Sequence, residues 1–582
     1  MKNRFLVRYS FIAFSVVLFV AISCKPTGFS QLWVEGYQRS ARPDIDIFLV
    51  PKKYALLQTK KATDTYSLAR FDKKQLESEL SHYSRSIQDL QSSDTAEYKE
   101  DGDTVSMKVG RVTHSTAYDY DTEIPLAFFG KWFDANKHNQ VVYQQEIAPT
   151  LASLMGVSMP ETAKLGSLNT KQLKQSNGSL QMPDIVVVAV IDQGGRNLLK
   201  LHSEVAPNIH SLIEKSDQYA KAKVGHLDAH TAVGHAAIGT GAFPMDNSII
   251  SNTYYWIERQ NGQSKLASRA IYAGKDESKV DSSEMTALTL ADQLNRAYNG
   301  KSVIVSQSYA LRAAIGMGGH GALNLPAESQ AAIRNSNFIY WLDSNSSHWI
   351  TDSRYYSVPS VARASDPLLQ FTKYYPTGFA GYQIRDRASA KKNWGTLMAT
   401  AAEAELEGEL IRAVIQSEII AKNKDKDGVP DLVYVSFKSA DAVGHKFGYQ
   451  SLEAKETLAT IDEQIGKLID FLKENYNDRF VLVLTADHGS VPLSEITGGL
   501  RLSIEEVINQ IDSLLPADVT KNHSLVKMMT VAQISLNHDL MQEYGITDRQ
   551  VAQKIMDITV NNQKFFAGVL TRQDLNLKPD KK

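Results

Sequence analysis

Five short apolar runs constrain the fold of this chain more than any other feature. They are rich in β-branched and aromatic residues and too short for typical helices: "IPLAFF", "IVVVAVI", "VIV", "LVYVSF" and "FVLVLT". Amphipathic helical patterns lie between them, such as the leucines and isoleucines spaced by three and four over residues 458–472. Buried strands that alternate with helices predict an α/β fold, with a mostly parallel sheet covered by helices on both faces.

Length and charge set limits on function. The 582 residues exceed one usual compact domain, and the 43% hydrophobic content is ordinary for a globular protein. Lysine and arginine total 63 against 65 aspartates and glutamates, a formal charge of -2. Because there is no basic excess to neutralise a phosphate backbone, nucleic acid is not an expected partner.

The N-terminus resembles a bacterial lipoprotein signal. Three basic residues precede the apolar run "FIAFSVVLFVAIS", and Cys24, the chain's only cysteine, follows at once. A generic signal peptide explains the basic and apolar parts but not the cysteine. A chance buried thiol and an uncleaved membrane anchor are the alternatives. We predict a signal peptide over 1–23 and an exported body tethered to the cell envelope by a lipid on Cys24.

Two later segments differ from the strand and helix pattern. Residues 165–183 lack periodicity and are rich in Ser, Asn, Gln and Gly, which predicts a linker. Residues from about 252 to 391 are dense in Tyr, Trp, Ser and Asn around one strand-like run, which predicts an inserted cap region. The main domain would then span 184–582.

Polar side chains follow three of the apolar runs. Asp192 follows the second run, Asp441 and His445 follow the fourth, and Asp487 and His488 follow the fifth. Because parallel sheets bind ligands beyond the carboxyl ends of their strands, these side chains should meet at one edge. Carboxylates and imidazoles without thiolates suit zinc or a similar divalent ion. Singly, each could be a capping aspartate or a hydrogen-bonded histidine, but three strands together favour a metal site.

A nucleophile is predicted at Thr231. Small residues and glycines follow it in "HTAVGHAAIGTG", which predicts a helix that starts at this hydroxyl and can bind phosphate at its amino end. An adjacent metal ion would lower the pKa of the hydroxyl. The alternative is a simple N-cap. For the nearby His226, His230 and His235 we expect packing or supporting roles.

Together these motifs resemble the alkaline phosphatase superfamily, in its type I phosphodiesterase and nucleotide pyrophosphatase branch. The resemblance rests on Asp192 and on "TAVGHAAIGTGAFP", "SNTYYW", "SADAVGHKFG" and "TADHGS". The stretches "DYDTEIPLAFFG" and "SLNHDL" most resemble bacterial alkaline phosphatases that use a threonine nucleophile. The resemblance covers nearly all of the chain after about Ala41. It implies an alkaline phosphatase-like fold and two-zinc hydrolysis of phosphate esters.

The resemblance also implies roles for individual residues. One zinc ion would be held by Asp441, His445 and His114, the last from "THSTAYDYDT". The other would be held by Asp192, Thr231, Asp487 and His488. Thr231 would be the nucleophile, and Asn252 would hold a phosphoryl oxygen.

The position of His114 implies a circular permutation. In the family its motif follows the aspartate–histidine pair, whereas here it precedes the first strand. Residues 24–164 would then complete the catalytic domain, and 165–183 would join the family's usual end to its usual beginning. "DIDIFLVPKKY" and "GVLTRQDL" resemble segments that are nearly consecutive in the family, so Asp574 should lie near Asp44.

One departure bears on the type of ester. Monoesterases of the family have a lysine and an arginine in "SxKxR", but this chain has "SYALR", with Ala310 and Arg312. A monoester carries about one more negative charge than a diester, so losing a cation should weaken monoester preference unless Lys438 compensates. We expect a phosphatase for small phosphate esters, acting through a phosphothreonine, with phosphodiesterase activity. The alternatives are a phosphodiesterase or nucleotide pyrophosphatase, and a catalytically inactive envelope lipoprotein that binds ligands.

Overall fold

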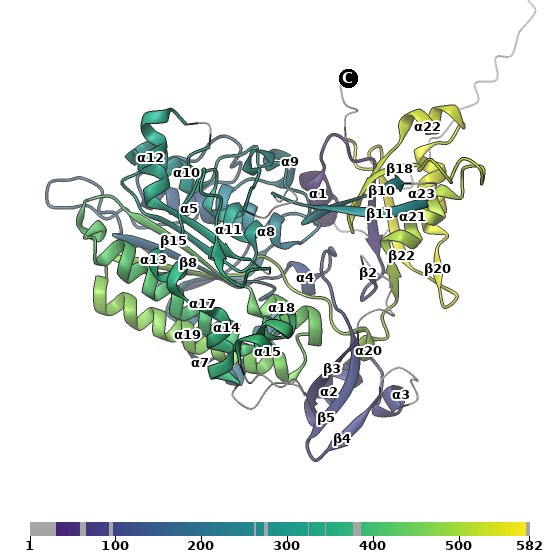
Figure 1. Cartoon of the computed structure of the whole chain (residues 1–582), viewed down its shortest axis with the longest axis horizontal. Coiled ribbons are helices and arrows are strands. Elements are labelled where there is room, and N and C mark those ends of the chain that lie inside the picture. The colour runs from purple at the N-terminus through teal and green to yellow at the C-terminus, as the bar shows by residue number, and fades with distance from the viewer. Residues whose placement is uncertain are drawn as a thin grey trace, which may run out of the picture.

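The computed structural model describes most of the chain after the predicted signal. The described residues are 31–58, 66–91, 97–260, 263–272, 278–323, 325–343, 345–375 and 386–577. The predicted signal peptide and Cys24 lie outside them. A large sheet with its helices, a second sheet, a small third sheet and two two-stranded sheets make up the described part of the chain (Figure 1). The two-stranded sheets pair β2 (Leu56–Gln58) with β17 (Arg501–Ser503), and β20 (Thr559–Val560) with β21 (Gln563–Lys564).

The large sheet has nine strands in the order β14-β13-β12-β15-β8-β16-β6-β9-β7. Their bounds are β6 Leu126–Phe129, β7 Asn136–Tyr143, β8 Ile185–Ile191, β9 Asp217–Lys223, β12 Ile304–Ser308, β13 Asn337–Leu342, β14 Trp349–Ile350, β15 Asp431–Phe437 and β16 Phe480–Thr485. The run from β13 to β16 is parallel throughout, while β6 is antiparallel to both neighbours. All five apolar runs therefore form strands of one mostly parallel sheet, and the predicted fold class is confirmed.

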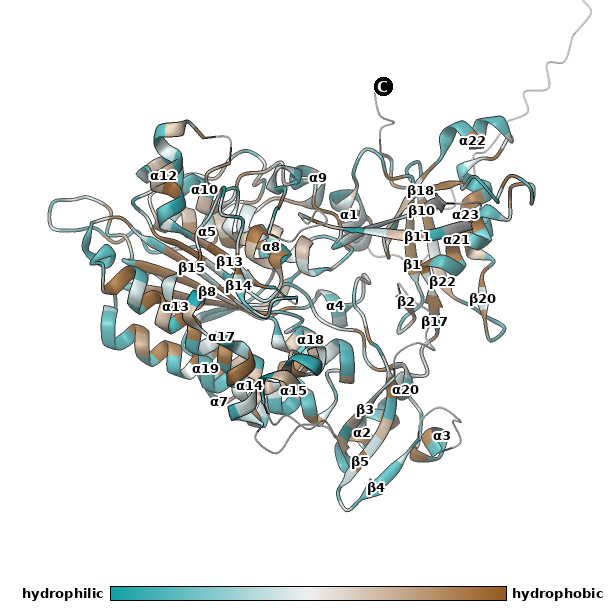
Figure 2. Ribbon diagram, in the orientation of Figure 1, coloured by the Kyte–Doolittle hydropathy of each residue, from teal (hydrophilic) through white to brown (hydrophobic). Residues whose placement is uncertain are grey.

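Helices cover both faces of this sheet because its central strand is apolar on both sides. Alternate residues of β8 from Ile185 to Ile191 pack with α17 (Ala401–Val414) and α19 (Leu452–Tyr476). The intervening residues Val186, Val188 and Val190 pack with α5 (Ile147–Leu154) and α10 (Leu290–Tyr298). Figure 2 shows the hydrophobic colour concentrated around β8 and β15. A strand buried on two faces needs the continuous apolar run seen in the sequence.

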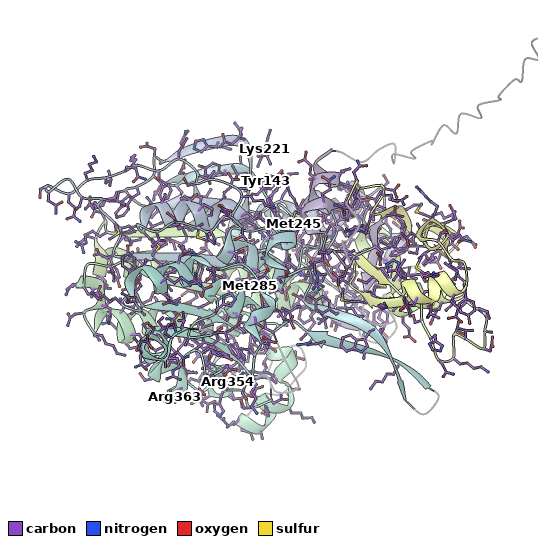
Figure 3. The ribbon with its side chains drawn as sticks, turned by 90° about the horizontal axis from the view of Figure 1, so that it is seen from above. Tyr143, Lys221, Met245, Met285, Arg354 and Arg363 are labelled. Carbon is purple, nitrogen blue, oxygen red and sulfur yellow. The ribbon has the colours of Figure 1, made fainter. Side chains whose placement is uncertain are left out.

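The second sheet has six strands in the order β11-β10-β18-β19-β1-β22. They are β1 Ile47–Pro51, β10 Thr253–Gln260, β11 Gln263–Ala270, β18 Val526–Met529, β19 Gln533–Leu536 and β22 Phe566–Thr571. Helices α21 (Ile504–Asp512) and α23 (Asp548–Met556) pack on it through their apolar residues. Its C-terminal strands and helices, in yellow, lie at the right-hand end of the molecule in Figure 3.

The two ends of the chain meet in this second sheet. Strand β1 pairs antiparallel with β22, and Ile47 lies opposite Thr571. The Arg572 side chain donates Nη1 to the carbonyl oxygens of Arg42, Pro43 and Ile45 at 3.2, 2.9 and 2.9 Å. The segment that ends at Asp574 therefore lies beside the segment that holds Asp44, as the sequence predicted.

Residues 252–391 differ from the expected single cap. Their first two strands, β10 and β11, belong to the second sheet, while β12, β13 and β14 belong to the large sheet. All six residues of β13, "NFIYWL", are buried. The aromatic residues and asparagines of this segment predict a surface cap. The buried strand β13 is missed because a short apolar run without alternation gives no periodic signal. The linker over 165–183 contains no helix or named strand.

A small third sheet precedes His114 and was not predicted. It consists of β3 (Tyr66–Asp72), β5 (Thr104–Gly110) and β4 (Lys99–Asp101), with α2 (Lys73–His82) and α3 (Ile87–Gln91). Arg70 of β3 binds Glu453 and Glu456 of α19 at 2.8 and 3.0 Å. In the part of the chain that the structure describes, no helix is long and apolar enough to cross a bilayer.

Candidate metal centre and nucleophile

The predicted ligands from three strands converge at the carboxyl edge of the large sheet. Asp192 follows β8 directly, and Asp487 follows β16. Asp441 lies in the first turn of α18 (Ser439–Phe447), the helix that follows β15. Neighbouring parallel strands thus place three carboxylates at one edge.

His114 reaches this edge because its segment is bonded to the loop after β16. Strand β6 pairs antiparallel with β16. Just before β6, the short helix α4 (Asp119–Thr122) supplies two acceptors to that loop: Gly489 N donates to Asp121 O at 2.7 Å, and Ser490 N donates to Tyr120 O at 3.0 Å. A Cβ atom on Gly489 would lie 2.0 Å from Tyr120 O, so only glycine fits there. The ring centre of His114 consequently lies 3.8 Å from that of His488.

His114, His445 and Asp441 form one cluster. The Nε2 atoms of His445 and His114 lie 3.2 and 3.8 Å from Asp441 Oδ1. Each ring places its other nitrogen against a carbonyl: His114 Nδ1 lies 2.6 Å from Ala229 O, and His445 Nδ1 lies 2.6 Å from Val112 O. With Nδ1 as the donor, Nε2 keeps its lone pair toward the carboxylate, the tautomer that a metal ligand requires.

Asp192, Asp487 and His488 form the adjoining cluster. His488 Nε2 lies 3.2 Å from Asp487 Oδ2 and 3.8 Å from Asp192 Oδ1, while its Nδ1 lies 2.9 Å from Gly489 O. These three facing atoms, His488 Nε2, Asp487 Oδ2 and Asp192 Oδ1, are buried without a hydrogen-bond partner among the described residues. Because leaving such atoms unpaired is costly, the donor set fits a divalent cation.

Burial and nearby charges raise the pKa of one aspartate and lower the pKa values of two histidines in these clusters. Burial, together with the nearby Asp487, raises the pKa of Asp192 well above its usual range. Burial lowers the pKa of His488 to about 4 and that of His114 well below its usual range. Both imidazoles are therefore neutral at neutral pH, the state in which histidine binds metal.

Thr231 is the first residue of α8 (Thr231–Thr240), a helix with every residue buried. Gly234 lets this helix approach the ligands, since a Cβ atom there would lie 2.6 Å from Asp487 O. Asn252 accepts from Ala232 N through Oδ1 at 2.8 Å, which fixes its side chain beside the start of the helix. Both predicted residues thus lie at one helix terminus, next to the carboxylate after β16.

Lys438 lies between the threonine and two of the carboxylates. Its Nζ donates to Thr231 Oγ1 at 3.0 Å and lies 3.0 Å from Asp192 Oδ2 and 2.6 Å from Asp441 Oδ2. Burial alone would lower the pKa of Lys438, but Asp192 and Asp441 outweigh it and raise the pKa. The sequence offered Lys438 only as an alternative cation; its contact with Thr231 is a new observation.

The three neighbouring histidines have other partners. His235 Nδ1 lies 2.8 Å from Thr231 O and 3.3 Å from Asp487 Oδ2, and its Nε2 lies 3.0 Å from Ser436 Oγ. Because both ring nitrogens of His235 have hydrogen-bond partners, we assign it a supporting role although it lies near two carboxylates. His226 Nδ1 lies 3.0 Å from Gln145 Nε2, and His230 contacts Asp228.

Arg312 lines the same site from α11 (Leu311–Gly318). A cavity of about 590 Å³ contains Arg312 together with Lys438, Asp441 and His445 in its lining. The Nε atom of Arg312 is buried and has no hydrogen-bond partner among the described residues. Ala310 is the N-cap residue of α11.

Comparisons with known proteins show the family of the chain. The family model described as type I phosphodiesterase / nucleotide pyrophosphatase matches residues 186–576. Alkaline phosphatase PhoV of Synechococcus elongatus is 24% identical over 427 residues, which cover 68% of this chain and 74% of that protein. A Myroides odoratus protein named calcium-transporting ATPase is 25% identical over 414 residues, 64% of this chain and 72% of that protein. The solved structure of alkaline phosphatase PafA shares 16% identity with a TM-score of 0.49, covering 67% of this chain and 84% of that chain.

These findings define the class of protein as a phosphoric ester hydrolase. More specifically, the chain belongs to the type I phosphodiesterase / nucleotide pyrophosphatase family, within the alkaline phosphatase superfamily. The family match begins at residue 186, so the segment that carries His114 lies outside it.

Buried His226 predicts acid sensitivity of the folded state. Burial lowers its pKa to about 3, whereas an unfolded histidine titrates near 6.5. Between these values the unfolded chain binds a proton that the folded chain does not, so stability falls as pH falls. Between pH 6.5 and 5 we expect the free energy of unfolding of His226→Gln to fall by about 1.5 kcal/mol less than that of the wild type. Denaturant unfolding of the metal-free protein measures this, with exposed His82→Gln as control; equal pH slopes in wild type and His226→Gln would contradict it.

Proposed function

We propose that this protein hydrolyses phosphate monoesters through a phosphothreonine at Thr231, with two zinc ions. The observation that carries the proposal is the position of Thr231 at a buried helix start, beside a donor set with unpaired buried atoms. The alternatives are a phosphodiesterase or nucleotide pyrophosphatase and an inactive binding lipoprotein. The intact donor set argues against the inactive form.

The zinc ions would be held by the two adjoining clusters. The first cluster offers His114, Asp441 and His445, and the second offers Asp192, Asp487 and His488, with Thr231 beside them. Bound zinc would supply Lewis acidity, which stabilises negative charge on oxygen and lowers the pKa of a hydroxyl.

The chain's own residues orient and stabilise the reacting groups. Lys438 Nζ, 3.0 Å from Thr231 Oγ1, holds the hydroxyl oxygen and favours its anionic form. Because Asn252 Oδ1 already accepts from Ala232 N, its amide NH₂ remains the donor for a phosphoryl oxygen. Arg312 would bind a second nonbridging oxygen from the cavity.

The reaction then has two balanced steps. Thr231 Oγ gives its proton to solvent and forms a bond to phosphorus while the ester bond breaks, and the leaving-group oxygen takes the bonding electron pair and a proton from solvent. Water then attacks the phosphothreonine, which releases inorganic phosphate and restores the hydroxyl of Thr231. Both steps place negative charge beside Lys438, where preorganised donors lower the barrier.

Replacing the nucleophile tests this mechanism. We expect Thr231→Ala to lower kcat/KM for an aryl phosphate by at least about a thousandfold, because the covalent route is lost. Thr231→Ser keeps a hydroxyl and should retain measurable turnover. A phosphoserine should be detectable in this variant after the reaction is trapped. Metal analysis should show unchanged zinc content in Thr231→Ser, and chelation should abolish activity until zinc is restored. Near wild-type turnover by Thr231→Ala would refute the phosphothreonine, and a zinc-loaded wild type without turnover would favour the binding lipoprotein.

Arg312 and Ala310 bear on the type of ester. With one cation of the family pair absent, we propose a monoesterase with high residual phosphodiesterase activity. Arg312→Ala should lower kcat/KM for an aryl phosphate about 10- to 100-fold and that for its methyl diester less, because the monoester dianion carries more charge. Exposed Arg296→Ala is the control. If the diester is the better substrate and Arg312→Ala changes neither rate, the phosphodiesterase alternative is correct.

We also propose that the chain is a circular permutation of the family order. The pairing of β1 with β22 and the family match that begins at residue 186 support this. Joining residue 577 to residue 31 by a flexible linker, which keeps α1 (Gln31–Ser40), and opening the chain within 165–183 should give a folded, active enzyme, since no named strand or helix is cut. Loss of zinc binding and of cooperative unfolding in that rearranged chain would contradict the proposal.

The lipid anchor remains a proposal from the sequence. The basic and apolar residues before Cys24 support export and attachment to the cell envelope. Mass spectrometry of the mature N-terminal peptide should show Cys24 as the first residue with a diacylglycerol adduct, and an unmodified or uncleaved N-terminus would exclude it.

A further inference from the structure

We infer that the cavity beside Thr231 binds a second anionic group, carried by the leaving group of the ester. The inference rests on the proposed function and names its substrate class: phosphate monoesters whose alcohol or phenol carries a carboxylate or a further phosphate. It depends on two residues outside the catalytic machinery, Arg111 and Lys446, which line the same cavity as Lys438 and Arg312.

The charges that line the cavity are unbalanced. Its cationic residues are Arg111, Arg312, Lys438 and Lys446, and Asp441 is its one carboxylate. Asp441 is engaged by Lys438 at 2.6 Å and by His445 at 3.2 Å. Among the described residues, no carboxylate forms an ion pair with Arg111, Arg312 or Lys446. Cations gathered without counterions repel one another, and an anionic ligand relieves that repulsion.

Arg312 and the proposed zinc ions would bind the phosphoryl group. Arg111 and Lys446 then remain to bind a second anion. Lys446 is on α18, one residue after the proposed ligand His445. Its Nζ donates to Thr396 Oγ1 at 2.7 Å, a neutral partner that orients the ammonium group without neutralising it. The exposed side chain of Arg111 provides a planar donor that can bind a carboxylate or phosphate in two places.

The position of Arg111 is fixed by the small third sheet and by His445. Strand β5 ends at Gly110, whose N–H donates to Glu495 Oε1 at 2.9 Å. Two residues later, Val112 N donates to His445 O at 3.0 Å, and Val112 O lies 2.6 Å from His445 Nδ1. Arg111 is therefore held between two anchored residues, on the segment that contacts α18.

The same small sheet gives the cavity an apolar wall. Tyr66 and Leu68 of β3 line it, and they remain 41% and 56% exposed. Phe447 and Met398 line it as well. Exposed apolar side chains beside cations suit a leaving group that has a carbon body and a charged end.

Matched substrates test the inference. The pair is an aryl phosphate with a ring carboxylate and the same compound with that carboxylate as its methyl ester. For the wild-type full chain we expect kcat/KM to be about tenfold higher for the carboxylate, a ratio that should fall with added salt. Arg111→Gln with Lys446→Met should reduce the ratio to about one while leaving kcat/KM for the methyl ester within about twofold. The control is Arg363→Gln, an exposed arginine on α13 (Ser360–Ala364) that is not among the residues lining the cavity.

A binding measurement separates this inference from the proposed function. Calorimetry with the corresponding aryl phosphonates, which cannot be hydrolysed, should show about tenfold tighter binding of the carboxylate form in wild type but not in the double variant. Turnover of both esters with a ratio near one would overturn the inference and leave the phosphatase proposal standing. Absent turnover with a retained difference in phosphonate affinity would support the anion site and overturn the phosphatase proposal. Equal phosphonate affinities would overturn the inference.

Discussion

The buried polar atoms at the carboxyl edge of the parallel sheet are the constraint on which the rest of the structure depends. Asp192 Oδ1, Asp487 Oδ2 and His488 Nε2 face one another there without a hydrogen-bond partner among the described residues, and the two carboxylates follow adjacent strands. Such an arrangement is unfavourable for an isolated domain. A divalent cation held by these atoms, as we propose, would make it favourable, and binding of the ion would then contribute to the stability of the fold.

The segment around His114 is held at that edge by strand pairing and backbone hydrogen bonds. Strand β6 joins the sheet antiparallel to β16, and the backbone of Tyr120 and Asp121 accepts from the loop that carries His488. This contact accounts for the glycine at position 489, where no side chain would fit. His114, early in the sequence, thus lies beside other predicted ligands that come much later. Strand pairing brings them together because β6 and β16 are neighbours in the sheet although they are far apart in the chain.

Lys438 and the cations of the cavity give this site a charge pattern of its own. Lys438 follows β15 and contacts Thr231, and we propose that it compensates for the lysine that the family resemblance implies at position 310. The small third sheet adds Arg111 and an apolar wall at the opening of the cavity. If the site binds the phosphoryl group as we propose, this neighbouring surface would let it select among leaving groups.

The sequence by itself determined the α/β class, the five strands named from their apolar runs, the family and the candidate ligands, because buried strands and strand-end polar residues leave local signals. It misjudged residues 252–391, since the buried strand β13 has no alternation that separates it from a surface segment. It could not reveal the small third sheet, the contact between Lys438 and Thr231 or the cation cluster around Arg111. The last two features join residues hundreds of positions apart, and only the pairing of strands and packing of helices decides which distant side chains meet.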